Sequence, residues 1–319
     1  MLVSPSCSVS WRFGIPRPLQ QLFDYFPLRA LDPNALPERS QCLTSSDLPT
    51  LYVFSTESDA RLGLPSFNPG CLKWQTLLRL SSLPFRILPS TNHASPTGAL
   101  PFLLPPRTTS TSTSSPPPVP ASQLLAYAQQ HSPSTKDNSN KIDLDPDLGP
   151  RAQAYLSLVT LSLRNAWLCA LYLDPSHADL LARLYARPAS SSRAVQAALL
   201  AQLRAAAAEQ IVTSTGGMVV TTSAAAGGVD EESVYREARE AMEALAGMVG
   251  ESGTGWVFGE ARPGVFDAGL FSYTHLMMEF MGEGLGRMVS ESGKGELARH
   301  RGRMLEAAWP GWDGKRPTE

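Results

Sequence analysis

Apolar and polar segments alternate most clearly between residues 51 and 104. A β-favouring apolar run at 51–54 is followed by a polar loop, a helical segment at 71–80 and a second short apolar run at 85–88. In the helical segment Cys71, Trp74 and Leu78 share one face at helical spacing. A third apolar run, 98–104, is entered through Pro101. Because two strands joined by a crossover helix lie parallel in one sheet, the pattern predicts a small α/β unit.

After Pro150 the apolar residues recur at helical spacing. We expect helices at 151–173, 178–186, 193–212, 230–249, from 267 to about 290, and at 295–309. Asp230 is expected to cap the fourth of these, and the acids that follow it suit the helix dipole. The chain is therefore predicted to be an α/β unit followed by an all-helical domain.

Composition places the boundaries between these parts. We expect an N-terminal arm at 1–49, the α/β domain at 50–131, a linker at 132–150, the helical domain at 151–310 and a tail at 311–319. The segments 106–118 and 213–228 are of low complexity and are expected to be loops. Residues 117–120 should make a poor strand, since three of the four are proline. Ser122 is expected to cap a short helix at 122–130.

Charge excludes one class of partner. The chain carries 27 basic and 29 acidic residues, a net charge of −2, and neither half has a basic stripe. Nucleic-acid binding needs clustered Lys and Arg, so we expect no nucleic-acid partner. The apolar segment 155–173 is long enough to span a bilayer, but it holds Arg164 and Asn165 at its centre, which favours a buried core helix. Membrane contact is therefore expected to run through partners.

The residues that could carry chemistry are scattered. The four cysteines lack metal or redox spacing, and the five histidines are isolated from each other. His275 is expected to be a hydrogen-bonded core histidine. The glycine-rich run 282–286 follows no predicted strand, so a phosphate loop is not expected there. We therefore predict no metal, no cofactor and no catalytic set.

Three phrases point to a family. Residues 65–74 (PSFNPGCLKW), 95–103 (SPTGALPFL) and 18–29 (PLQQLFDYFPLR) resemble the metaxin family, in particular its fungal receptor subunits of the mitochondrial sorting and assembly machinery (the SAM complex). The order of elements also resembles glutathione transferases, whose thioredoxin-like domain places a cis proline just before its third strand. The resemblance implies a thioredoxin-like N-terminal domain with a cis bond before Pro101, followed by an all-helical domain.

A further likeness lies in the helical domain. Residues 264–271 resemble the transferase capping box at the start of the helix that crosses the domain core, with Asp267 at the third helical position. The expected Ser or Thr is replaced by Gly264, so only half of the reciprocal cap survives. Asp267 and Pro101 are therefore expected to be structural residues.

The resemblance also implies a function. It implies a non-enzymatic receptor and scaffold, peripheral on the cytosolic face of the mitochondrial outer membrane. The implied partners are the barrel-forming core subunit, a second metaxin-like subunit and β-barrel precursor proteins, whose C-terminal sorting signal is an extended amphipathic strand. An exposed sheet edge is one physical way to hold such a strand. The residues expected to contact partners are Phe23, Tyr25, Phe26, Phe67, Asn68, Trp74, Ser95 and Thr97.

Two alternatives remain open. A glutathione transferase needs a hydroxyl or thiol after the first strand, backbone groups beside the cis proline and a Ser at a helix N-terminus. The candidates are Ser55, Ser66 or Cys71 for the first, Leu100 and Pro101 for the second, and Ser122 for the third. The other alternative is a transferase-like docking module in a cytosolic complex.

Overall fold

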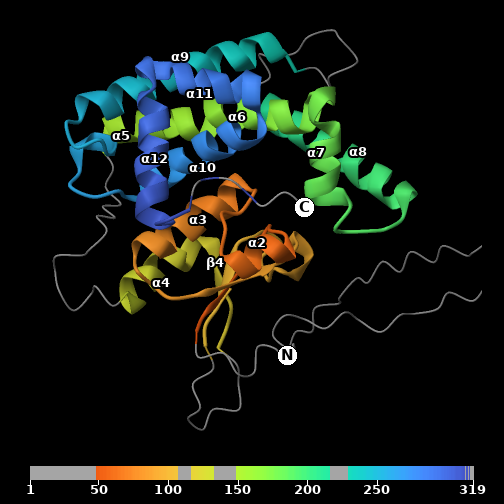
Figure 1. Cartoon of the computed structure of the whole chain (residues 1–319). Helices are drawn as coiled ribbons and strands as arrows, with labels where there is room; N and C mark the ends of the chain where they lie inside the picture. Colours follow the sequence, from red (N-terminus) through yellow and green to blue (C-terminus); the bar gives the residue numbers. More distant parts are fainter. Residues whose placement is uncertain are drawn as a thin grey trace, which may run out of the picture.

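The computed structural model describes residues 48–106, 116–132, 149–215, 229–312, 314 and 316. A small sheet with its helices forms the N-terminal domain, and a bundle of helices is stacked against it (Figure 1). This is the predicted order of an α/β domain followed by an all-helical domain.

The sheet has four strands in the order β2-β1-β3-β4. The strands are β1 Thr50–Val53, β2 Arg86–Pro89, β3 Phe102–Leu104 and β4 Val119–Pro120. As predicted from the crossover helix, β1 and β2 are parallel, with Leu51 beside Ile87. β3 is antiparallel to β1, and β4 is antiparallel to β3. The Leu100–Pro101 peptide bond is cis, as the resemblance implied.

One expectation for the end of this domain was wrong. Residues 117–120 were expected to make a poor strand, and only Val119 and Pro120 form one, with Val119 paired to Leu103. Ser122 does not cap a helix. It lies exposed in a 3-10 turn, η4 (Ala121–Gln123), and α4 (Leu124–His131) begins after it.

Helix α3 (Pro69–Leu80) is the element that the two domains share. Its buried Cys71 and Leu78 pack with Leu51 and Leu103 of the sheet. Its buried Leu72 belongs instead to the core of the helical domain. Asn68 caps the helix by accepting a hydrogen bond from the Cys71 amide at 3.2 Å, and Pro69 occupies the first turn, where its missing N–H costs nothing.

A short helix, α2 (Glu57–Leu62), lies where the sequence predicted a polar loop. Thr56 Oγ1 accepts a hydrogen bond from the Asp59 amide at 3.1 Å and so starts it. Gly63 ends it at φ +68, a left-handed conformation that favours glycine. Six residues are too few to show a helical period, so only the caps could have predicted this helix.

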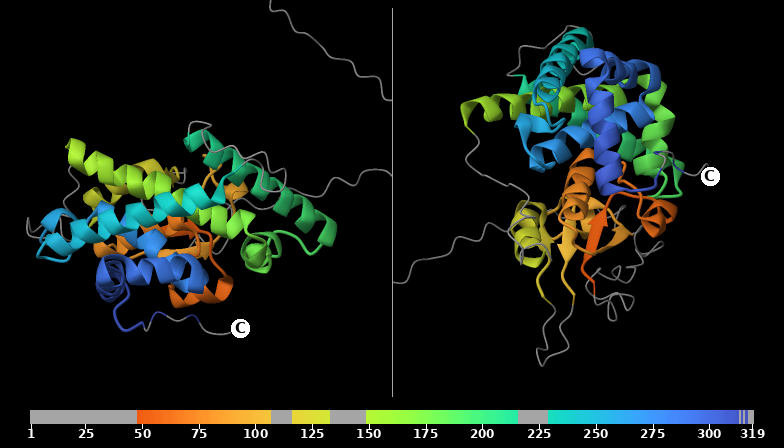
Figure 2. Two further views of the ribbon diagram at one scale, coloured as in Figure 1. Left: turned by 90° about the horizontal axis from the view of Figure 1, so that it is seen from above. Right: turned by 60° about the vertical axis from the view of Figure 1, so that its left-hand side comes forward.

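The helical domain follows the predicted order. Its elements are α5 Pro150–Ser157, η7 Leu158–Leu163, α6 Arg164–Leu168, η8 Cys169–Leu173, η9 Pro175–His177, α7 Ala178–Leu181, η10 Ala182–Ala186, α8 Arg193–Ser214, α9 Glu231–Glu251, η12 Val257–Gly259, α10 Val265–Phe280, η13 Gly282–Gly286, α11 Arg287–Glu291, η14 Ser292–Lys294 and α12 Glu296–Ala308. Asp230 caps α9 through the Ser233 amide, as predicted. The bundle covers the face of the N-terminal domain that carries α3 (Figure 2).

One described helix, Pro150–Leu173, is long and apolar enough to cross a membrane by length and composition alone. In the window that meets this test, 44% is buried inside the protein. Leu163, Ala166 and Trp167 lie in the core of the bundle. This packing is that of the core helix that the sequence predicted.

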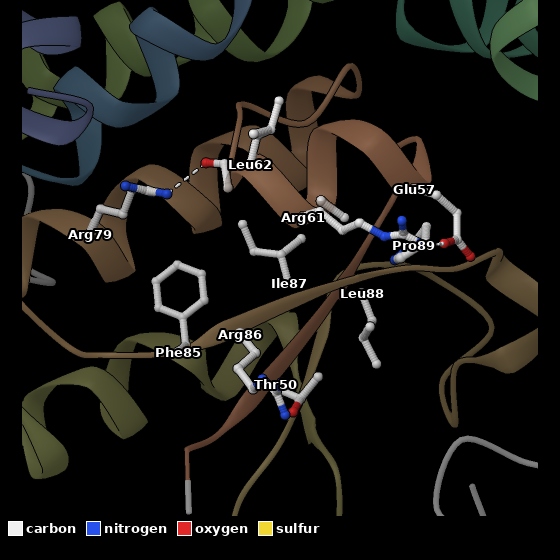
Figure 3. Close-up of a pocket in the computed structure, with 12 residues that line it drawn as sticks. Thr50, Glu57, Arg61, Leu62, Arg79, Phe85, Arg86, Ile87, Leu88 and Pro89 are labelled. Atoms are coloured by element: carbon white, nitrogen blue, oxygen red, sulfur yellow. Dashed lines mark hydrogen bonds and ion pairs between the residues drawn. The ribbon is translucent and has the colours of Figure 1, made fainter. Parts of the chain in front are cut away.

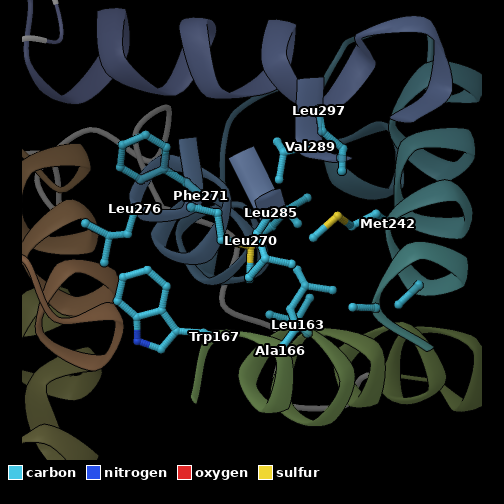
Figure 4. Close-up of a cluster of buried hydrophobic side chains, with 14 of the residues drawn as sticks. Leu163, Ala166, Trp167, Met242, Leu270, Phe271, Leu276, Leu285, Val289 and Leu297 are labelled. Carbon is cyan, nitrogen blue, oxygen red and sulfur yellow. The ribbon is translucent and has the colours of Figure 1, made fainter. Parts of the chain in front are cut away.

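Helix α10 runs through the centre of the bundle. Leu270, Phe271 and Leu276 are fully buried and meet Trp167 of α6 and Leu297 of α12 within one hydrophobic cluster (Figure 4). Burying side chains of this size stabilises the fold by about 1.5 to 3 kcal/mol each. The bundle is therefore organised around α10.

The single helix predicted from 267 to about 290 is broken. α10 ends at Phe280, and the chain turns through η13 before α11. A Cβ at Gly286 would lie 2.8 Å from the Met277 carbonyl oxygen, so only glycine lets the turn return this closely to α10. The glycine-rich run is thus a packing turn.

Asp267 is buried at the start of α10 and joins three segments. Its Oδ2 accepts a hydrogen bond from the Gly264 amide at 2.9 Å, which is the half of the capping box that the sequence retained. Its Oδ1 accepts one from the Val257 amide at 3.0 Å and lies 2.9 Å from His300 Nε2 on α12. His300 is fully buried, so the two side chains form an interior pair.

We expect Asp267→Ala to lower the free energy of unfolding by about 3 kcal/mol, because it leaves two amides and an imidazole buried without a partner. Urea denaturation followed by circular dichroism measures this. Asp230→Ala is the matched control, since that cap serves a single amide, and it should cost about 1 kcal/mol. Equal losses in the two variants would contradict this role for Asp267.

Candidate functional site

The loop after β1 holds the residues that were considered for a glutathione thiolate. Ser66 is fully buried, and its hydroxyl donates to the Phe54 carbonyl oxygen at 2.6 Å and accepts from the Asn68 amide at 3.2 Å. Cys71 is fully buried, and this burial raises the pKa of its thiol to about 12. At neutral pH the Cys71 sulfur is therefore protonated and enclosed. The Ser66 hydroxyl holds the loop together.

An aromatic cluster covers the loop that follows β1. Tyr185, from η10 of the helical domain, lies edge-on to Phe54 and Phe67, with ring centroids 5.2 and 5.4 Å apart. Asn68 donates from Nδ2 to the Tyr185 hydroxyl at 3.2 Å. Burial raises the pKa of Tyr185 well above its ordinary value, so this hydroxyl stays neutral.

This cluster corrects the expectation for Phe67. Its side chain is 3% exposed, because it folds back between the domains and does not reach a surface where a partner could meet it. Asn68 is likewise engaged, by the Cys71 amide and by Tyr185. Trp74 is half-buried against the core of the N-terminal domain. The phrase 65–74 thus serves mainly the joint between the two domains.

The turn before the cis proline is hydrogen-bonded within itself. Ser95 is buried, and its hydroxyl donates to the Ala99 carbonyl oxygen at 2.7 Å and lies 3.2 Å from the Thr97 hydroxyl. The Leu100 amide donates to Asn92 Oδ1 at 3.0 Å. The amide beside the cis proline is thus already bonded within the chain. Thr97 itself is exposed. Phe23, Tyr25 and Phe26 lie outside the described residues.

The open region is the β2 edge of the sheet. A groove of about 770 Å³ lies between β2 and α2, and we call it the β2 groove. Its lining residues are Thr50, Glu57, Ala60, Arg61, Leu62, Gly63, Arg79 and 85–89. Ile87 and Phe85 point toward α2 and α3, while Arg86 and Leu88 point to the other face of the sheet (Figure 3). Leu62 is 61% exposed, so the groove has an apolar rim.

The backbone of β2 leaves hydrogen-bonding groups on this edge. The Arg86 and Ser90 amides donate to the Pro49 and Val53 carbonyl oxygens, both at 2.9 Å, and so face β1. Because the direction of backbone groups alternates along a strand, Ile87 turns its N–H and C=O outward. β2 is the end strand of the sheet that the structure describes, so these groups point away from β1 and pair with no described strand.

The charges of the β2 groove are mostly positive. Three arginines and one glutamate line it. Arg61 pairs with Glu57 at 3.0 Å, but both side chains are highly exposed, so this pair adds little stability. Arg86 is exposed and has no ion-pair partner within the described ranges.

Arg79 ties the floor of the groove to the helical domain. It donates to the Gly63 carbonyl oxygen at 2.6 Å and to that of Ala308 at 3.2 Å. Its guanidinium lies 4.9 Å from the centroid of the Trp309 ring, and Trp309 Nε1 also donates to Gly63 O, at 3.0 Å. Sequence reasoning missed these contacts, because Ala308 and Trp309 lie more than 200 positions from Gly63 and Arg79 and share no local pattern with them. It also missed α2, which supplies one wall of the groove.

The β2 groove is suited to one mode of recognition. An extended peptide could add to β2 through the Ile87 backbone, with alternate side chains meeting Phe85, Ile87 and Leu62. No group of three or more His, Cys, Asp or Glu side chains suited to a metal occurs among the described residues.

Known proteins agree with the fold. Residues 69–177 match the family model described as the glutathione S-transferase N-terminal domain. No characterised sequence matches the chain significantly.

Solved structures similar to the chain are glutathione transferases. One is a glutathione transferase family member from Pseudomonas fluorescens with two glutathione molecules bound, which is 14% identical, with 82% of this chain and 93% of that chain covered at a TM-score of 0.41. Another is glutathione transferase F2 from Populus trichocarpa, at 11% identity, 80% and 99% coverage and a TM-score of 0.34. A third is a glutathione S-transferase from Sinorhizobium meliloti, at 14% identity, 83% and 100% coverage and a TM-score of 0.36.

The strand order, the cis proline and the family match carry the conclusion. The chain has a glutathione-transferase-like fold, with a thioredoxin-like domain followed by a helical domain.

Proposed function

We propose that this chain is a non-enzymatic receptor and scaffold subunit of the mitochondrial outer-membrane machinery that assembles β-barrels. In this proposal it is peripheral on the cytosolic face and bound to the barrel-forming core subunit and to a second metaxin-like subunit. It helps to recognise β-barrel precursors and to insert them into the membrane. The metaxin-like phrases at 18–29, 65–74 and 95–103 motivate the choice of machinery.

One observation supports the proposal that the chain is not an enzyme. The groups that were candidates for holding glutathione are mostly engaged within the chain: Ser66 by Phe54, the Leu100 amide by Asn92, and Cys71 by burial. Tyr185 also closes the space above the β1 loop. A ligand there would have to displace an interdomain aromatic cluster, which stabilises the protein by more than its buried area alone.

The β2 groove supports the receptor part. A precursor's sorting signal is an extended amphipathic strand, and β2 offers the edge that such a strand needs. The incoming strand would place its apolar side chains against Ile87, Phe85 and Leu62. The arginines of the groove favour a segment with acidic or carboxylate groups.

A glutathione transferase is the second candidate. The family match to the transferase N-terminal domain favours it. One polar atom favours it too: Ser55 Oγ, directly after β1, is buried and has no hydrogen-bond partner among the residues described. A docking module in a cytosolic complex is the third candidate, since the same fold and groove would serve it.

We expect Ile87→Pro to weaken binding of a precursor strand about tenfold, because it removes the outward N–H of β2 and blocks close approach. The probe is a fluorescein-labelled peptide with the last strand of a mitochondrial β-barrel protein, and fluorescence anisotropy measures its dissociation constant. Ile87→Val keeps the N–H and is the matched control.

Circular dichroism and thermal midpoints confirm that both variants fold. A scrambled peptide should bind more weakly than the native strand to the unaltered protein. Unchanged affinity in a folded Ile87→Pro variant would refute strand addition at β2.

The transferase alternative predicts a different result. We expect no retention on glutathione agarose and no turnover of 1-chloro-2,4-dinitrobenzene above background, because the Ser66 and Leu100 groups are occupied. Retention together with turnover that Ser55→Ala or Ser66→Ala abolishes would favour the enzyme instead.

Cell fractionation separates the receptor from the cytosolic module. We expect the chain to sediment with mitochondria, to be digested by protease added outside, and to be released by carbonate. Native purification should recover it with the barrel-forming subunit. A wholly soluble cytosolic pool would favour the module.

A further inference from the structure

A second cavity lies between the two domains, away from the β2 groove. Its volume is about 610 Å³, and we call it the interdomain cavity. Its walls come from the start of α3, from α4, from α5 and η7, and from the loop and first turns of α10. None of the residues considered for glutathione, Ser55, Ser66, Cys71, Leu100 and Ser122, lines it. It is therefore a separate site of the size that small-molecule pockets have.

The walls are mainly apolar. Five different elements contribute apolar side chains: Leu125, Leu156, Val159, Phe258, Val265 and Phe266. Tyr155 and Phe258 stand edge-on with centroids 6.0 Å apart, and Phe258 and Phe266 do so at 5.2 Å, which fixes one side of the cavity. An alkyl chain in the cavity would displace water from these apolar side chains, and this burial would favour its binding.

Two half-buried cations also line the cavity. Lys73 of α3 and Arg164 of α6 form no ion pair with any described residue. Burial lowers the pKa of the Lys73 ammonium, as happens to a cation that loses water without gaining an anion. Burial raises the pKa of Tyr273 to about 12, and the charge of Arg164 opposes that rise, which places Arg164 near Tyr273 in the same wall.

Neither acid of the cavity forms an ion pair with these cations. Asp267 lines the wall, but its oxygens are taken by the Gly264 and Val257 amides and by His300. Glu260 is exposed and pairs with neither Lys73 nor Arg164. An anion that enters the cavity would therefore meet two cations that form no ion pair with a described residue.

We propose that the interdomain cavity binds a single-chain amphiphile with an anionic head group, with the head group on Lys73 and Arg164 and the chain along the apolar wall. The shared chemistry is a carboxylate or a phosphate monoester on an alkyl chain. A small hydrophilic anion would not bury the apolar wall. A neutral lipid would bury that wall but would give Lys73 and Arg164 no anionic partner. This proposal does not depend on the proposed receptor function.

Isothermal titration calorimetry of the full chain tests the proposal with four ligands of one chain length. They are dodecanoate, dodecyl phosphate, dodecanol and dodecyltrimethylammonium, each below its critical micelle concentration. We expect at least one anion to bind at a single site, about tenfold more tightly than dodecanol, and the cation not to bind. The anion that binds more tightly identifies the head group as carboxylate or phosphate.

Variants locate the site. Lys73→Met keeps the length of the side chain and removes the charge, and Arg164→Gln replaces the second cation by a shorter neutral polar side chain. Each should weaken anion binding about tenfold and leave dodecanol binding unchanged. Lys73→Arg should retain anion binding. Arg183→Gln, which removes an exposed cation of the helical domain that does not line the cavity, should have no effect.

Thermal midpoints of the free variants show whether each folds, and a folded Lys73→Arg keeps the test valid if Lys73→Met does not fold. The proposal is overturned if dodecanol binds as tightly as the anions, if neither anion binds, or if folded Lys73→Met and Arg164→Gln bind anions as the unaltered chain does.

Discussion

The fold depends on one buried carboxylate. Asp267 accepts hydrogen bonds from the amides of Gly264 and Val257 and pairs with His300, so it fixes the start of α10, the preceding loop and α12 together. α10 is the centre of the helical core and also packs against α3, where a Cβ at Gly269 would lie 4.0 Å from the aliphatic part of Lys73. Because α3 in turn covers the sheet, the position of the N-terminal domain follows from the position of α10. A buried carboxyl group is tolerated here because both of its oxygens have hydrogen-bond partners.

The contacts between the two domains determine where the structure has open cavities. α3 is buried on both sides, Tyr185 reaches across to Phe54 and Phe67, and Arg79 and Trp309 converge on Gly63. The Tyr185 contacts cover the loop after β1, and the contacts of Arg79 and Trp309 form the floor of the β2 groove. The β2 groove thus lies on one side of α3 and the interdomain cavity beside its first turn. The packing between the domains therefore shapes the walls of both.

The sequence predicted the elements that repeat a pattern and missed those that depend on distant partners. β1, α3, β2 and the long helices show clear periods, and the cis bond before Pro101 was implied by the resemblance to glutathione transferases. α2 is one and a half turns long and β4 is a strand of two residues, so neither could show a period. The break after Phe280 lies in a run of glycines that fits a turn as well as a helix end.

The candidate site was predicted less well than the fold. Phe67 lies in a loop context, where a side chain can fold back or meet a partner; we expected a partner, and only the placement of Tyr185 beside it shows that it folds back. An exposed edge was expected, but the sequence does not say which strand provides it. Arg79, Trp309 and the pair Asp267 and His300 are joined across long separations, and a single sequence carries no signal for such contacts.

The two edges of the sheet differ because of its prolines. At the β4 edge the residues from 116 to 120 are proline except for Val119, so this edge can offer one N–H at most. Strand addition is therefore easier beside β2 than beside β4. A second copy of the chain could not pair its own β2 with the β4 edge of the first, because that edge has too few amide donors. This asymmetry between the two edges disfavours edge-to-edge stacking of copies of the chain into a continuous sheet.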